Sequence, residues 1–222
     1  MAAILGFLLR ATVESWLASQ PRSPRYLAWA VLFGIGFFLT AILPLIQWDR
    51  WILLPLGAGI ALGPIGLQAI RWLRIRGRLL GEAVVVGSLS LLAPAVVYAG
   101  TGEFDKWTGF LWLPVALYLW GGITYVRMSL VSAAKGATRS QIERRRTAAL
   151  YHASLPLALA AAVAGGVMPA LATLAYIPMM SKAVRALWGN VRAVQVRRLG
   201  VWEAIHAGVF AALLIALYRL AE

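Results

Sequence analysis

The ionisable residues that border the apolar runs of this chain are placed unevenly. Glu203 and His206 are three residues apart, so a helix presents them on one face. Glu82 and His152 would join that face if their own helices are neighbours. Two Glu and two His side chains suit zinc or iron, with Glu-x-x-His the spacing of di-iron bundles. A single such motif with few carboxylates is weak evidence, so we predict no metal and no other cofactor.

Two interpretations of these residues stay open. In the first, the carboxylates neutralise neighbouring arginines, and the long side chains extend to the membrane interface. In the second, a pocket binds an anionic headgroup or small anion through Arg71, Arg127 and His152, and the carboxylates hold the arginines in place. The predicted ligand-binding residues are Arg71, Glu82, Arg127, His152, Glu203 and His206. We identify no catalytic residue, and hydrolase, P-loop and dinucleotide fingerprints do not occur.

The elements that must position these residues are membrane-spanning helices. Hydrophobic residues make up 61% of the 222 residues and charged residues only 13%, with a mean hydropathy of +0.78. Soluble domains carry about a quarter charged residues. We therefore predict an all-α, polytopic transmembrane helical bundle that forms one integral membrane domain over residues 1–222, with seven full spans. The predicted spans are 26–46, 51–70, 79–99, 107–126, 148–164, 168–187 and 201–218.

Residues 2–18 are apolar enough to associate with the membrane, yet Arg10 and Glu14 lie one turn apart within them. An interfacial helix would explain this segment. We favour part of a further span, in which Arg10 and Glu14 form a buried pair because an unpaired charge in hydrocarbon is costly.

The basic residues define an orientation. All 21 Lys and Arg residues except Arg50, Lys106 and Arg219 fall on one side when the spans are laid end to end. The positive-inside rule then places the basic loops in the cytoplasm and the C-terminus outside, in a plasma (inner) membrane of bacterial type. The net charge of +13 lies in short loops between spans, so the expected partner is the lipid bilayer rather than nucleic acid.

Small residues mark one span for close helix packing. Gly59-x-x-x-Gly63, with Gly57 and Gly66 beside it, gives span 51–70 a narrow strip. We favour packing of this strip within the monomer over a dimer interface.

From Tyr125 onward the chain resembles the YwiC-like family of bacterial multi-pass membrane proteins, whose activity is unassigned. The resemblance rests on short strings: Tyr125-Val126-Arg127, Tyr151-His152, Arg197-Arg198-Leu199-Gly200 with Glu203 and His206, and a segment from Phe7 to Pro21 similar to the family's second helix. The His-Gly-Ala-Trp-like motif of the family's first helix does not occur, so we expect a first apolar segment upstream of Met1. The resemblance implies a membrane protein and no particular substrate.

The function we expect is a permease or binding protein for a small anionic or lipid-like molecule. A membrane enzyme on a distant UbiA-type scaffold is an alternative, without magnesium-dependent prenyl transfer, because the predicted cytoplasmic side has no aspartate. A membrane assembly or structural factor is a further alternative.

Overall fold

The computed structural model describes residues 8, 12–13, 15–16, 24–72, 78–132, 139–188 and 196–221, and these ranges contain helices and no strand. The helices are α2 (Pro24–Gln47), α3 (Leu53–Trp72), α4 (Arg78–Ser90), α5 (Leu92–Thr101), α6 (Lys106–Phe110), α7 (Trp112–Ser132), α8 (Arg139–Ala164), the 3₁₀ helix η1 (Ala170–Tyr176), α9 (Ile177–Trp188) and α10 (Val196–Arg219). The predicted all-α class is confirmed for the described residues. The predicted N-terminal helix, with Arg10 and Glu14, lies outside them.

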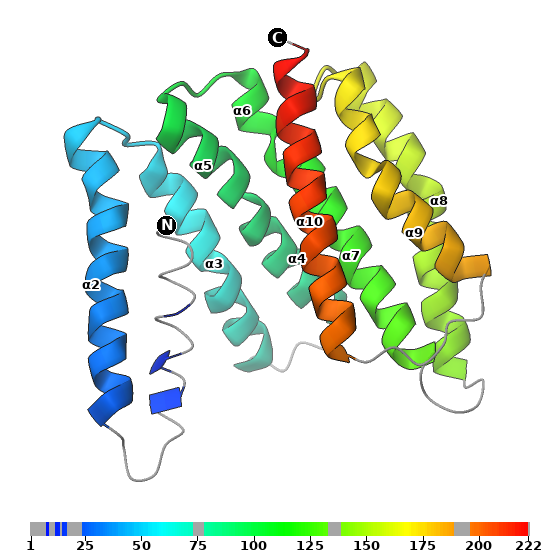
Figure 1. Ribbon diagram of the computed structural model, residues 1–222, viewed down its shortest axis with the longest axis horizontal. Coiled ribbons are helices and arrows are strands. Elements are labelled where there is room, and N and C mark those ends of the chain that lie inside the picture. The colour runs from blue at the N-terminus through cyan, green and yellow to red at the C-terminus, as the bar shows by residue number, and fades with distance from the viewer. Residues whose placement is uncertain are drawn as a thin grey trace.

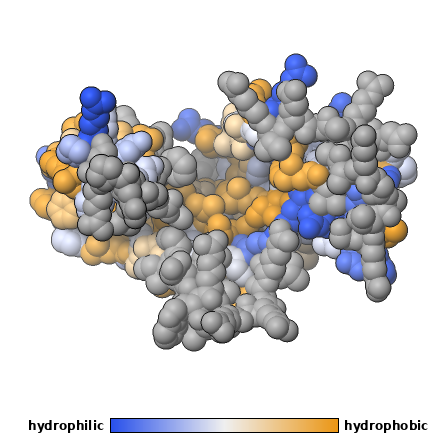
Figure 2. Space-filling view, turned by 90° about the horizontal axis from the view of Figure 1, so that it is seen from below, coloured by the Kyte–Doolittle hydropathy of each residue, from blue (hydrophilic) through white to orange (hydrophobic). Residues whose placement is uncertain are grey.

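The helices run up and down beside one another (Figure 1). In this view α2, α4, α8 and α10 begin at the lower end, and α3, α7 and α9 finish there. The sequence places its clusters of basic residues next to these same helix ends. Seen from below, hydrophilic residues lie at several places around this end, and apolar residues are exposed between them (Figure 2).

Among the described residues, five helical segments are long and apolar enough to cross a membrane. They are Pro24–Gln47, Leu80–Thr101, Lys106–Leu130, Gln141–Ala164 and Arg198–Arg219. Each overlaps a predicted span. Many of their apolar side chains point outward; Leu157 of α8, for example, is 75% exposed, as expected for a surface that faces lipid.

The other two predicted spans have a different form. Span 51–70 corresponds to α3, of which Leu53–Gly63 is a shorter apolar helix. Span 168–187 is two consecutive elements, η1 and α9. Pro178 is the second residue of α9 and has no backbone N–H, so it cannot continue a ladder of i→i−4 hydrogen bonds from the preceding turn. A tighter 3₁₀ turn therefore leads into α9.

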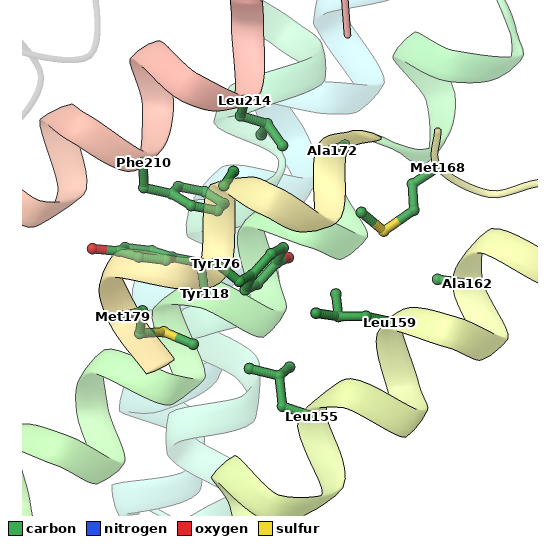
Figure 3. Packing of buried hydrophobic residues seen from close by; sticks show 11 residues of the cluster. Tyr118, Leu155, Leu159, Ala162, Met168, Ala172, Tyr176, Met179, Phe210 and Leu214 are labelled. Atoms are coloured by element: carbon green, nitrogen blue, oxygen red, sulfur yellow. The ribbon is translucent and has the colours of Figure 1, made fainter. Parts of the chain in front are cut away.

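The best-buried side chains lie where α7, α8, η1, α9 and α10 meet (Figure 3). Phe210 of α10 stacks on Tyr118 of α7 with ring centroids 3.9 Å apart, and meets Tyr176 of η1 edge-on at 5.2 Å. The hydroxyl of Tyr176 donates to the carbonyl of Pro114 at 2.6 Å, and that of Tyr151 donates to the carbonyl of Leu117 at 2.5 Å. Large rings and two phenol hydrogen bonds thus hold α7 to its neighbours.

The glycine strip of α3 packs against α4 and the start of α5. A Cβ atom built on Gly63 would lie 2.7 Å from the Cβ of Ser88, and one on Gly59 would lie 2.6 Å from a methyl carbon of Leu91. A Cβ on Gly66 would come within 3.0 Å of Val84, whereas one on Gly57 would meet nothing within 4 Å. The predicted packing of this strip within the monomer is confirmed, and only Gly57 of the four is free of such contact.

Candidate functional site

Helix α7 is the element around which the polar residues gather, because α4, α8, α9 and α10 all contact it. Two adjacent glycines on α7 let neighbouring side chains reach its backbone. A Cβ on Gly121 would lie 2.7 Å from the sulfur of Met179, so no larger residue fits there without a shift. A Cβ on Gly122 would lie 3.8 Å from an oxygen of Glu203. The Glu203 carboxylate of α10 is therefore beside the backbone of α7.

An ion pair joins α9 to α10 at this point. The ammonium of Lys182 donates to both carboxylate oxygens of Glu203, each at 2.8 Å, and it lies 4.2 Å from the ring centroid of Tyr125 on α7. The side chains of Lys182 and Glu203 are 11% and 20% exposed. Charge-assisted hydrogen bonds and the face of the aromatic ring both stabilise the ammonium where little water reaches it.

His152 of α8 is close to this pair. Its side chain is buried, at 3% exposed, and Lys182 lies close enough to interact with it electrostatically. The ring Nδ1 is 2.8 Å from the carbonyl of Ala148, which can only accept, so Nδ1 carries the proton. The buried Nε2 has no hydrogen-bond partner among the described residues. In the neutral ring, Nε2 is thus an unpaired acceptor within electrostatic range of Lys182.

A second ion pair joins α4 to α7, between Glu82 and Arg127. Their side chains are 18% and 23% exposed. Arg127 follows Tyr125 by two residues, a rotation of about 200° around a helix, so the two side chains leave α7 on roughly opposite sides. The Glu82 pair lies on the α4 side of α7, and the Lys182 pair lies between α7, α9 and α10.

The predicted ligand-binding residues are therefore distributed. The structure brings Glu82 to Arg127 and leaves Glu203 with Lys182, near His152. His206 shares the helix of Glu203, but its Nδ1 bonds the carbonyl of Trp202 at 2.7 Å. Arg71 is the last residue but one of α3, and its side chain lies outside the described part of the structure. A single ligand site formed by all six residues stays a prediction.

Sequence reasoning did not single out Lys182 or Tyr125 as site residues. Lys182 was counted only among the basic residues of one side, and Tyr125 only as part of a family string. A signal for Lys182 was present, because it is a lysine inside the apolar run 168–187. Ionisable residues within such runs face the bundle interior and mark functional sites.

Together these side chains place one ammonium, one carboxylate, a phenol ring and an imidazole inside an apolar bundle. Such a set can bind an anion and exchange a proton. Within the described residues, no group of three or more His, Cys, Asp and Glu side chains is placed to hold a metal ion. No family model, no curated protein and no solved structure matches this chain.

Proposed function

We propose that this chain is a multi-pass membrane permease or binding protein for a small anionic or lipid-like molecule, and that the anionic group binds at Lys182. The partly buried Lys182–Glu203 pair beside Tyr125 carries the proposal. Replacing a buried ion pair by apolar side chains often leaves a protein equally or more stable, so stability alone is a poor reason for such a pair. Charges inside membrane bundles commonly mark the path of a ligand or ion.

The chemistry of Lys182 suits this role. An ammonium is a compact charge with three N–H donors. In the structure the Lys182 ammonium contacts both carboxylate oxygens of Glu203. An anionic ligand would offer a group of the same kind. The ring of Tyr125 adds a second stabilising contact that does not depend on Glu203. A ligand anion can therefore replace the Glu203 carboxylate without leaving the ammonium unsupported.

The proposed topology has seven crossings, with the basic loops in the cytoplasm and the C-terminus outside. Five of these crossings are the segments that have the length and composition of a span. The sixth is α3, and the seventh consists of η1 followed by α9. The gathering of basic helix ends at one end of the bundle supports this topology. Reporter fusions within 71–78 and 133–147 should read cytoplasmic, and fusions within 100–106 external. The reverse pattern would overturn the orientation.

Membership of the YwiC-like family belongs to the same proposal. Three of the residues in its strings, Tyr125, His152 and Glu203, lie around Lys182. The resemblance assigns no activity of its own.

The experiment that tests the function compares wild type with K182Q and with K106Q, a matched Lys→Gln change at exposed Lys106. Each protein is purified, and co-purifying small molecules and lipids are identified by mass spectrometry. We expect an anionic compound with wild type and K106Q that is depleted with K182Q. Uptake of that compound into proteoliposomes then indicates a permease, and retention without uptake indicates a binding protein. Identical profiles for all three proteins would reject the proposal.

A further inference from the structure

We infer that the anion binds at Lys182 together with one proton, which Glu203 takes up as its carboxylate leaves the ammonium. This inference rests on the proposed function and adds that anion binding is coupled to proton uptake. The site accepts an anion and a proton as a neutral pair.

The argument is one of charge balance. In the structure the charges of Lys182 and Glu203 cancel, and their side chains are only 11% and 20% exposed. An anion that replaces Glu203 on the ammonium would leave the Glu203 carboxylate as an uncompensated charge in the same low-dielectric region. Such a charge is unfavourable there, because it loses hydration that no partner replaces. A proton on Glu203 removes the charge, so binding of the anion favours binding of the proton.

The groups that face Glu203 offer no alternative compensation. From α7, the phenols of Tyr118 and Tyr125 lie within electrostatic reach of it, and both are neutral hydroxyls near pH 7. From α9, Lys182 is its ion-pair partner. From α8, His152 is near Lys182, and on α10 itself His206 bonds the Trp202 carbonyl. Among the described residues, no second Lys or Arg is paired with Glu203.

His152 is the competing proton acceptor. Its Nε2 is buried without a hydrogen-bond partner among the described residues. A proton there would place a second positive charge beside Lys182, which the incoming anion would have to balance while Glu203 stayed ionised. Protonation of Glu203 creates no such surplus. The experiment must therefore separate Glu203 from His152.

Two monoanionic probes distinguish a free anion from a lipid headgroup: octanoate and short-chain dihexanoyl phosphatidylglycerol. Each is titrated into the full-length protein in phosphatidylcholine nanodiscs. Calorimetry gives the affinity, and a pH-indicator dye in weakly buffered solution gives the protons taken up. The variants are E203Q, H152Q, K182Q and the double variant K182Q/E203Q, with E103Q as the matched Glu→Gln control at exposed Glu103. Circular dichroism confirms that each variant is folded.

For the probe that binds, we expect wild type and E103Q to take up about one proton per anion. Their affinity should fall about tenfold for each unit of pH increase, because binding that takes up a proton is favoured at low pH. E203Q should bind without proton uptake and without this pH dependence. K182Q and the double variant should lose binding. The double variant has no stranded carboxylate, because it keeps a neutral pair of hydrogen-bonding side chains. Its loss of anion binding therefore reports on the missing ammonium.

The outcomes separate the coupling from the function. Wild type that binds a probe without proton uptake overturns the coupling and leaves the proposed function standing. Proton uptake that persists in E203Q and disappears in H152Q places the proton on His152, which also overturns the inference. If wild type binds neither probe more tightly than K182Q does, the anion site at Lys182 is rejected, and the inference fails with it.

Discussion

The regions on the two sides of α7 differ in how their side chains pack. Toward α8, η1 and α10 it packs through large rings, with Tyr118 stacked on Phe210 and Tyr176 edge-on to the same ring. On the other side, beyond α4, the contact between α3 and α4 depends on glycines of α3, with Gly63 against Ser88. Helices in lipid gain little from hydrophobic burial against one another and depend on van der Waals fit. Large rings dominate the first region, although Gly121 of α7 also admits Met179 there, and glycines dominate the second. Loss of a ring should therefore harm the first region, and added bulk on a glycine should harm the second.

The largest expected effect is a loss of bulk on the ring-packed side. Phe210→Ala removes the ring that contacts both Tyr118 and Tyr176, and its residue is only 4% exposed. Buried Phe→Ala changes cost about 3–5 kcal/mol, because they lose contacts and leave a cavity. Denaturant unfolding in detergent, followed by circular dichroism, would measure it. Ile215→Ala on the same helix is the control, since Ile215 is 58% exposed and should change the unfolding free energy little. Equal losses in the two variants would contradict a core at this position.

The ion pair on the same side should give the next largest effect. Lys182→Ala leaves the Glu203 carboxylate without its partner. Breaking a buried pair costs about 3–5 kcal/mol; we expect about 2–3 kcal/mol because a fifth of the Glu203 side chain is exposed. The double variant K182A/E203A should be more stable than K182A alone, since it removes the stranded charge. A double variant less stable than the single one would show that Lys182 and Glu203 stabilise the bundle separately, through contacts other than their pair.

This pair also shows where sequence reasoning stops. Apolar run length predicts the segment Pro24–Gln47 nearly to its ends, because a span must match the membrane thickness. The glycine strip was predicted as well, because small residues four apart share a helix face. Apolar run length and small-residue spacing do not indicate which helices are neighbours in the bundle. Glu82, Arg127 and Glu203 were placed in one predicted set, in which the carboxylates hold the arginines, and the structure pairs Glu82 with Arg127 on the α4 side of α7. The sequence did not indicate that Glu203 pairs with Lys182.

The break in span 168–187 has a visible cause in the sequence. Pro178 lies inside that run, and prolines are common enough in membrane helices that a single one rarely indicates a change of helix type. Here it separates η1 from α9. The consequence for the site is direct, because Lys182 and Met179 both follow the break and contact α7 from α9.

On the glycine side, a gain of bulk should be harmful. Gly63→Ala places a Cβ 2.7 Å from that of Ser88, inside van der Waals contact, so α3 and α4 must separate. Overpacking of this kind costs about 1–3 kcal/mol. Gly57→Ala is a matched control, because a Cβ there meets nothing within 4 Å, and alanine favours the helix. The same unfolding assay should rank G63A below wild type and G57A at or above it. The opposite order would remove the distinction between the glycine-packed region of α3 and α4 and the ring-packed region around α7.

The smallest expected effect tests the connection between the two regions. Short α6 contacts both α5 and α7, and Asp105 caps it by accepting from the backbone N–H of Thr108 at 2.7 Å. Hydrogen bonds from Thr108 lower the pKa of Asp105 below its ordinary value of 3.8. A carboxylate with a lowered pKa stabilises the fold above its unfolded pKa, and this contribution disappears as the pH falls through the folded value.

Asp105→Ala should therefore reduce the unfolding free energy by less than about 1 kcal/mol at neutral pH, as expected for an exposed N-cap. The difference from wild type should shrink as the pH falls below 3.8 and vanish once the carboxyl is protonated in both states. Thr101→Ala, at an exposed position on the neighbouring α5, is the control and should show no such pH dependence. A loss as large as that of Phe210→Ala would mean that α6 fixes how the glycine-packed and ring-packed regions meet, and that the two regions are not independent.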